Sequence, residues 1–201
     1  MEGMNKSLSS FQKMIAGVLL AIAISMLMPT SSIHAASKDL NVPIKNQEKS
    51  QWCWVTAPQI IIQYHLGSAP SQCTLVQRGK NIKTCPNEPG TLSETQRAMT
   101  KSGISNGGTI VSGTVSFNTI KSNINNYRPM ILRKEWKDGK GKKTGIGHLT
   151  VVHGFNDDSS TAKVYIVRIR ESNSYKDTVL YSELLNNPKF VWTHTIHNIR
   201  K

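Results

Sequence analysis

The spacing of apolar residues changes at Arg128-Pro129, and this change is the feature that most constrains the fold. Before this point, apolar residues recur at the spacing of one face of a helix. After it, they alternate or form short continuous runs, which is typical of strands. A helical first half followed by an antiparallel second half predicts an α+β fold. No internal repeat or long linker interrupts the pattern, so one domain is expected.

Three helices are predicted in the first half. They cover Trp54–Tyr64, Leu92–Ser102 (with Thr91 or Ser93 as the N-cap) and Ser116–Asn126. Pro58 is compatible with the first of these only if the helix begins late or bends, because proline removes a backbone hydrogen bond. Residues 65–90 are polar and are expected to be rich in loops.

Four strands are predicted in the second half. They are Met130–Leu132, Gly147–Phe155, Val164–Arg170 and Phe190–Ile196. The turn residues Asn156–Ser159 make a hairpin of the second and third strands. The lysine- and glycine-rich segment Lys137–Lys143 is expected to be a flexible loop.

Residues 1–35 have the pattern of a signal peptide. Lys6 and Lys13 form a basic start, an apolar run follows over Met14–Met28, and small residues provide a cleavage site after Ala35, or alternatively after Ala36. The apolar run is shorter than the roughly 20 residues of a membrane span, although an uncleaved anchor is the alternative. We therefore expect a secreted protein whose mature domain covers residues 36–201.

The chain is strongly basic, with a formal net charge of +13. Loss of residues 1–35 leaves this charge almost unchanged. Such a charge favours anionic surroundings, namely cell-envelope polymers, anionic lipid, nucleic acid or acidic substrates, and does not choose among them; anionic cell-envelope polymers are one candidate partner beside the polypeptide substrate. No zinc-finger spacing or aromatic RNA-binding run is present, so no specific nucleic-acid binding is expected.

The chain has three cysteines, so at least one lacks an intramolecular partner. Cys73 and Cys85 lie in polar sequence, and an oxidising compartment favours a disulfide between them. Cys53 then remains free between Trp52 and Trp54. It is either a buried, inert residue or a thiol with a function.

Nucleophilic catalysis is the chemistry that would explain a free Cys53. The positive end of a helix, an imidazole and an amide donor all help a thiol to attack a carbonyl. Cys53 lies at the start of a predicted helix. Gln47 is expected to donate its side-chain NH₂ to an oxyanion, together with the backbone N–H of Cys53.

His148 is the expected general base, because Gly147 before it leaves room for a substrate backbone and the apolar strand after it holds it rigidly. His153 has the opposite parity in the same strand and faces the other side. If the next strand stays extended beyond its apolar part, Glu171 or Asn173 accepts the N–H of His148. Either residue could equally be a solvated member of a polar turn.

The segment V-P-I-K-N-Q47-x5-C53-W54 resembles the nucleophile segment of papain-like cysteine proteases. The later run RPMIL…GHLTVVHGFND is similar to the bacterial C39-like and AvrRpt2-like peptidases. The resemblance covers most of residues 42–185. It implies a papain-like fold, with Cys53 as nucleophile, His148 as base, Gln47 as oxyanion donor and an Asp or Asn after the next strand as the orienting residue.

Three departures from the family pattern concern the site. Ser50-Gln51-Trp52 replaces the Gly-Ser pair that often precedes the nucleophile, Pro58 lies in the helix, and the Asp-Pro of the C39-like peptidases is absent. The last departure leaves the choice between Glu171 and Asn173 open.

These features together predict a secreted, monomeric papain-like cysteine peptidase that acts on polypeptides without a metal or organic cofactor. One alternative is an acyltransferase or amidase that uses the same Cys–His pair. Another is a non-catalytic basic module that binds the cell envelope, in which Cys53 is buried.

Overall fold

The computed structural model describes residues 36–158 and 161–201, and the predicted signal peptide lies outside these residues. The helices are α2 (Cys53–Leu66), α3 (Gln72–Lys80), α4 (Leu92–Thr100), α5 (Phe117–Asn125) and α6 (Tyr181–Leu185). The strands are β1 (Ala36–Asp39), β2 (Thr109–Ser112), β3 (Met130–Lys137), β4 (Lys143–Asp157), β5 (Lys163–Arg168), β6 (Tyr175–Leu180) and β7 (Phe190–His197). The α+β prediction is confirmed.

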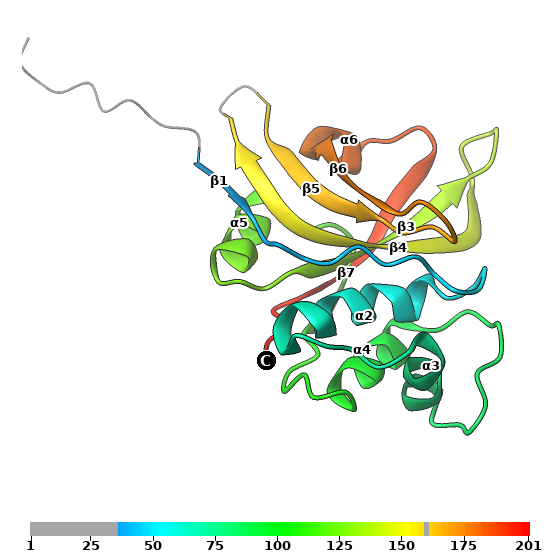
Figure 1. Cartoon of the computed structure of the whole chain (residues 1–201). Coiled ribbons are helices and arrows are strands. Elements are labelled where there is room, and N and C mark those ends of the chain that lie inside the picture. Colours follow the sequence, from blue (N-terminus) through cyan, green and yellow to red (C-terminus); the bar gives the residue numbers. More distant parts are fainter. Residues whose placement is uncertain (1–35, 159–160) are drawn as a thin grey trace, which may run out of the picture. The chain divides into compact units, whose positions relative to one another are not determined.

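The strands form one antiparallel sheet in the order β2-β7-β3-β4-β5-β6, and β1 pairs with the end of β4. Helices α2, α3 and α4 lie together on one side of this sheet (Figure 1). Helix α2 packs against both β4 and α4, while α3 packs against α4. Helix α2 therefore lies against β4, an inner strand of the sheet.

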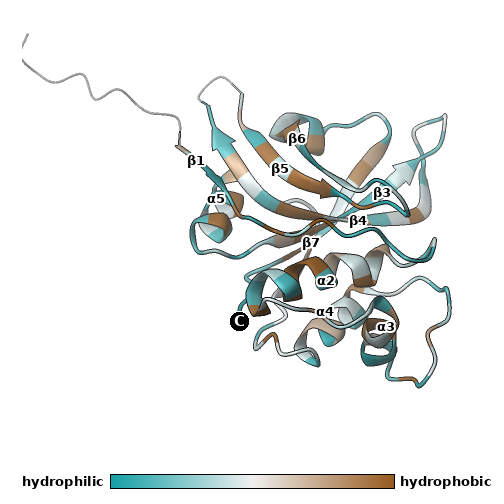
Figure 2. Cartoon of the chain, in the orientation of Figure 1, coloured by the Kyte–Doolittle hydropathy of each residue, from teal (hydrophilic) through white to brown (hydrophobic). Residues whose placement is uncertain are grey.

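Helix α2 is buried on almost every side, because it lies between the sheet and the other two helices. Its residues from Trp54 to Ile62 are all buried. A helix that is apolar all round is expected in such a position. Figure 2 shows this concentration of hydrophobic residues in α2 and in strands such as β5.

Pro58 lies inside α2, and the structure compensates for the hydrogen bond that it removes. A proline at this position leaves the carbonyl of Trp54, four residues earlier, without its helical donor. The hydroxyl of Thr95, on α4, lies 3.2 Å from that carbonyl oxygen. Thr95 is fully buried, and its single hydroxyl hydrogen is shared between this oxygen and the carbonyl oxygen of Thr91 at 3.0 Å, so a neighbouring helix replaces the missing donor in part.

The structure corrects the predicted loop at residues 65–90, because α3 occupies part of it. The side chain of Ser71 caps this helix by accepting from the Thr74 backbone N–H. Only four residues of α3 are buried, so its periodic signal is weak. All three predicted helices are confirmed, as α2, α4 and α5, and Thr91 caps α4 in a capping box with Glu94.

The four predicted strands are present, but β1, β2 and β6 were not predicted. Strand β4 is longer than expected, and its extension with β3 reduces the predicted flexible loop to the tip of a hairpin. Among the described residues, no helix has both the length and the apolar character needed to cross a bilayer.

Candidate active site

Cys53 is the first residue of α2, and the two tryptophans beside it anchor a loop. The indole N–H of Trp52 donates to the carbonyl of Pro86 at 2.9 Å, and that of Trp54 donates to the carbonyl of Glu88 at 3.0 Å. This loop follows Cys85, which is bonded to Cys73 of α3. The tryptophans thus position both the start of α2, where Cys53 lies, and one wall of the cavity next to it.

Cys53 and His148 line the same cavity, whose volume is about 520 Å³. The structure therefore brings together two residues that lie far apart in the sequence. The cavity is bounded by the loop before α4, the start of α2 and the strands β3 and β4. Its other lining residues are Gln51, Trp54, Pro89, Gly90, Thr91, Leu92, Arg133, Gly145, Ile146, Gly147 and Leu149.

A backbone carbonyl orients the ring of His148. The Nε2 atom lies 2.9 Å from the carbonyl oxygen of Ile169, just after β5. A carbonyl oxygen only accepts hydrogen bonds, so Nε2 carries the hydrogen in this contact and the neutral ring has its lone pair on Nδ1. Nδ1 is therefore the nitrogen available as a base.

Neither Glu171 nor Asn173 has a hydrogen bond to His148 in the structure. Strand β5 ends at Arg168, and the chain then bends into β6. Asn173 is exposed and has a φ of 55°, which is incompatible with the extended chain that its predicted role requires. Glu171 lines a second cavity together with His148 but forms no hydrogen bond to it.

The surroundings favour neutral forms of both groups. Burial raises the pKa of the Cys53 thiol, although backbone N–H groups of Leu149, Trp54 and Cys53 and the charge of Arg133 act in the opposite direction. Burial and the neighbouring charge of Lys134 lower the pKa of His148 to about 4. At neutral pH, His148 is thus an unprotonated base close to a cluster of N–H donors that would stabilise a thiolate.

Gln47 is buried in the segment that precedes α2. Its backbone N–H donates to the carbonyl of Arg170 at 2.7 Å, and its side-chain NH₂ donates to the carbonyl of Ser50 at 3.0 Å. An amide NH₂ has two hydrogens, so one remains for another acceptor. Gln47 lines the second cavity, which also contains His148, but not the cavity lined by Cys53.

Gln72 holds the segment around Gln47, and sequence reasoning did not identify it. Its side-chain NH₂ donates to the carbonyl of Asn46 at 2.7 Å, and its oxygen accepts from the N–H of Glu48 at 2.9 Å. The same side chain bonds Gln59 and Thr56 of α2. Gln72 is 1% exposed. The only signal in the sequence was its position beside Cys73.

Arg133 is a second residue of the cavity that was not predicted. Its guanidinium donates to Thr193 at 2.7 Å and to Glu135 at 3.3 Å. A Cβ atom on Gly147 would lie 2.6 Å from this guanidinium. Gly147 therefore makes room for Arg133, whereas the sequence suggested that it makes room for a substrate backbone.

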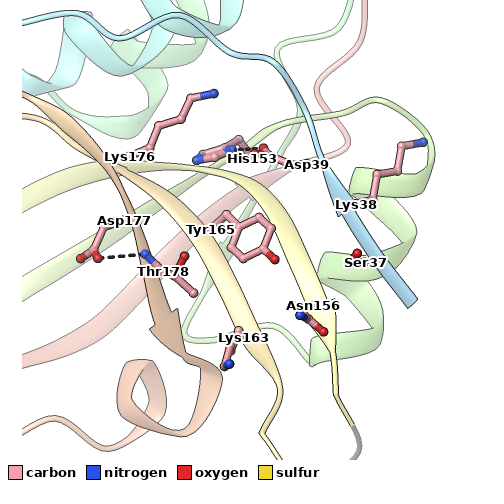
Figure 3. A pocket seen from close by; sticks show the side chains of 10 residues that line it. All are labelled: Ser37, Lys38, Asp39, His153, Asn156, Lys163, Tyr165, Lys176, Asp177 and Thr178. Carbon is pink, nitrogen blue, oxygen red and sulfur yellow. Dashed lines mark hydrogen bonds and ion pairs between the residues drawn. The ribbon is translucent and has the colours of Figure 1, made fainter. Parts of the chain in front are cut away.

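His153 faces a different cavity, as its parity predicts. Its Nδ1 atom lies 2.6 Å from a carboxylate oxygen of Asp39 on β1 (Figure 3). Burial lowers the pKa of His153, while the contact with Asp39 opposes this shift. In the described part of the chain, no group of three or more His, Cys, Asp or Glu side chains is placed to hold a metal ion.

Comparisons with known proteins agree with this geometry. Residues 36–180 match the family described as papain-like cysteine protease AvrRpt2. No curated protein matches the sequence. Among solved structures, the chain is similar to digestive procathepsin L 3 of the Tenebrio molitor larval midgut, with a TM-score of 0.51 and 11% identity over 85% of this chain and 72% of that one.

The structural similarity shows the fold alone at this level of identity. The family match is more specific, because it covers most of the chain and supports the AvrRpt2-like branch of the two bacterial branches that the sequence resembles. The chain belongs to the papain-like cysteine protease family of AvrRpt2 and is a cysteine-type peptidase.

Proposed function

We propose that this protein is a secreted peptidase that hydrolyses peptide bonds through an acyl-enzyme on Cys53. The observation that carries the proposal is the contact between His148 Nε2 and the Ile169 carbonyl at 2.9 Å. This contact leaves Nδ1 as the basic nitrogen in a cavity that Cys53 also lines. A thiol and an unprotonated imidazole in one cavity are the minimum that thiol catalysis requires.

The mechanism follows from these positions. Nδ1 of His148 takes the proton of Cys53, and the sulfur attacks the carbonyl carbon of the peptide. The second hydrogen of the Gln47 amide and the backbone N–H of Cys53 are the proposed donors to the oxyanion. His148 then gives its proton to the leaving amine. A water molecule, activated by the same nitrogen, hydrolyses the thioester and regenerates the thiol.

Secretion is part of the proposal. Two features support it, namely the signal-peptide pattern of residues 1–35 and the disulfide between Cys73 and Cys85. Disulfides persist in oxidising compartments and are rare in the cytosol. Cys53, His148 and Gln47 all come from one chain, so a monomer is sufficient for the reaction. The positive charge supports an association with anionic cell-envelope polymers.

The reactivity of Cys53 tests the proposal. The mature protein is treated with limiting iodoacetamide between pH 4 and pH 9, and modification of each cysteine is mapped by mass spectrometry, in parallel with a peptide-hydrolysis assay. His148→Ala is compared with His153→Ala. The control variant removes an imidazole from the same strand, but one that lines the cavity beside Asp39 and not the Cys53 cavity. We expect His148→Ala to slow alkylation at neutral pH by at least about tenfold and to abolish hydrolysis, whereas His153→Ala retains both.

Alkylation of Cys53 at the wild-type rate in His148→Ala would show that His148 does not activate the thiol. Hydrolysis that persists in Cys53→Ala would show that another group attacks the substrate. Either result would overturn the proposed mechanism.

A further inference from the structure

A second cavity lies beside His148, and its chemistry differs from that of the Cys53 cavity. Its volume is about 350 Å³, and three cationic residues line it: Lys134, Arg168 and Arg170. Among the described residues that line it, Glu171 is the one carboxylate. The cavity is thus basic at a position next to the proposed base.

Lys134 is the central cation of this cavity. It pairs directly with His148 in the register of β3 and β4, so the two side chains point to the same face of the sheet. Lys134 is 6% exposed. Its ammonium lies 4.7 Å from the centre of the Trp136 ring and 5.3 Å from that of Phe190. No described residue accepts a hydrogen bond from it or forms an ion pair with it.

The carboxylates near the cavity leave Lys134 unpaired. The charge of Asp177 acts on Lys134, but Asp177 is already bound to Arg168 at 2.7 Å. Arg170 is exposed and stacks on Tyr175, with its guanidinium carbon 5.0 Å from the ring centre. Lys134 and Arg170 are therefore cations without a carboxylate among the described residues.

Burial of an unpaired ammonium opposes folding, because the charge loses its hydration. The pKa of Lys134 is accordingly lowered from 10.5 to about 8, through burial first and then through Arg168 and Arg170. At neutral pH the ammonium is still charged. One buried oxygen atom at the same cavity, Thr150 Oγ1, also has no hydrogen-bond partner, and its hydroxyl is able to donate to a carboxylate. Such a set of unsatisfied groups is expected where a ligand completes the site.

The position of the proton donor, His148, indicates which part of a substrate would reach this cavity. His148 gives its proton to the leaving amine, so the leaving segment passes on the side of His148. The second cavity contains His148 and lacks Cys53, whereas the first contains both. The amine that accepts the proton from Nδ1 lies in the Cys53 cavity, and because His148 lines both cavities, the residues that follow the amine are directed past the ring toward the second cavity.

We propose that this cavity is a specificity pocket for a carboxylate on the leaving side of the scissile bond, and that Lys134 is the residue that binds it. This inference rests on the proposed function. The carboxylate could be the side chain of an Asp or Glu residue, or the terminal carboxylate of a chain that ends just after the scissile bond. Arg170, at the rim, adds a second positive charge.

Binding of a carboxylate would also affect the base. The charge of Lys134 is one of the causes that lower the pKa of His148. A carboxylate paired with Lys134 offsets that charge, so the pKa of His148 rises and the ring becomes a stronger base. Binding of an acidic substrate would thus make His148 a stronger base for the cleavage of that substrate.

Matched peptides test this proposal. Cleavage sites are first mapped by mass spectrometry in a tryptic peptide library, and one cleaved sequence is then synthesised with Asp, Asn or Lys at the first and second positions after the scissile bond. All three forms carry an amidated C-terminus. A shortened form ends just after the scissile bond, with a free or an amidated carboxyl group, and distinguishes the terminal carboxylate from the side chain.

The variants compared are Lys134→Met, Lys134→Arg and Lys163→Met. Lys163 is a lysine of β5 that lines the cavity of His153. We expect the wild type to cleave one of the carboxylate forms with a kcat/KM at least about tenfold higher than its neutral match. Lys134→Met removes this preference, Lys134→Arg retains it, and Lys163→Met leaves it unchanged. Equal cleavage of the matched peptides by the wild type, or a preference that survives in Lys134→Met, would overturn the proposal.

A binding measurement separates this proposal from the proposed function. Cys53→Ala is titrated with the shortened forms and with fluorescently labelled, capped alanine octapeptides that differ only in one Asp or Asn. Tighter binding of a carboxylate form that disappears in Cys53→Ala/Lys134→Met supports the pocket even if the wild type cleaves no peptide. Equal binding of all matched forms overturns it even if peptides are cleaved.

Discussion

Lys134 lies directly opposite His148 on the antiparallel strands β3 and β4, and its buried ammonium has no carboxylate partner among the described residues. This pair links the stability of the protein to the chemistry of the site. The same positive charge that lowers the pKa of the base is itself costly to bury. Natural proteins commonly keep such destabilising groups where function requires them.

Lys134→Met is expected to stabilise the protein at neutral pH. The folded-state pKa of Lys134, about 8, is below the unfolded value of 10.5, so folding opposes protonation of this group. The penalty is fully present below pH 8 and disappears as the pH rises through 10.5. At about 1.4 kcal/mol for each pKa unit, the gain at pH 7 is at most about 3 kcal/mol. Urea denaturation at pH 7 and pH 10 measures it, and a gain that is as large at pH 10 would contradict this explanation.

The acidic limb of the pH profile of kcat/KM should move to higher pH in Lys134→Met. The charged and titratable groups around His148 are Lys134 and Arg133 on β3, Cys53 on α2, and Arg168, Arg170 and Glu171 at the second cavity. Burial and then the charge of Lys134 lower the pKa of His148 to about 4. Removal of that charge raises that pKa, so the limb of kcat/KM for a neutral peptide shifts upward by about one unit. Lys163→Met is the control, and an unchanged limb in Lys134→Met would show that Lys134 does not act on the base.

Gln47→Ala tests the proposed oxyanion donor. Loss of one such donor typically lowers kcat by about 100-fold or more, with a smaller effect on KM, because the bond forms mainly in the transition state. Gln77→Ala is a suitable control, since Gln77 donates only to the Lys83 carbonyl in the α3 region. A kcat within about twofold of the wild-type value in Gln47→Ala would exclude this role.

Gln72→Leu should reduce both stability and kcat. The variant leaves the Glu48 N–H and the Asn46 carbonyl without their partner in a partly buried network. Unsatisfied buried groups of this kind cost about 1–3 kcal/mol each, so a loss of about 2–4 kcal/mol is expected by chemical denaturation. Gln77→Leu, on the same helix, should be nearly neutral. Unchanged activity in a destabilised Gln72→Leu protein would show that the segment around Gln47 does not depend on Gln72.

Removal of the disulfide with Cys73→Ser/Cys85→Ser should lower the free energy of unfolding by about 2–3 kcal/mol. It should also lower kcat/KM, because the loop after Cys85 receives the hydrogen bonds of Trp52 and Trp54 beside the nucleophile. The free energy is measured by denaturation without reductant. Wild-type peptidase activity in the double variant would show that the loop keeps its position without the bridge.

Much of the fold was predictable because its signals are local. Helix α2 has an apolar sequence long enough to be recognised, and α4 has the capping box of Thr91 and Glu94. Strands β3, β4, β5 and β7 carry β-branched or alternating apolar residues. These preferences act between residues close in sequence, so the sequence alone expresses them.

The elements that were missed are short, polar or exposed. Helix α3 has few buried residues, and β6 contains a single buried residue, Val179. Strand β6 forms because β5 offers it a full set of hydrogen-bond partners from Lys163 to Arg168. Pairing between strands is a tertiary interaction, and it overrides the weak preferences of the segment itself.

The sequence by itself determined the α+β order of elements, the free Cys53 at the start of an apolar helix and His148 in a buried strand, because these depend on residue types and local spacing. Only the tertiary structure decided that the Ile169 carbonyl orients His148, that Gln72 holds the segment of Gln47 and that Lys134 is buried opposite the base. A backbone carbonyl is present at every residue and leaves no mark in the sequence. Which carbonyl, amide or ammonium reaches the site depends on how distant segments pack, and that packing is settled by the whole chain at once.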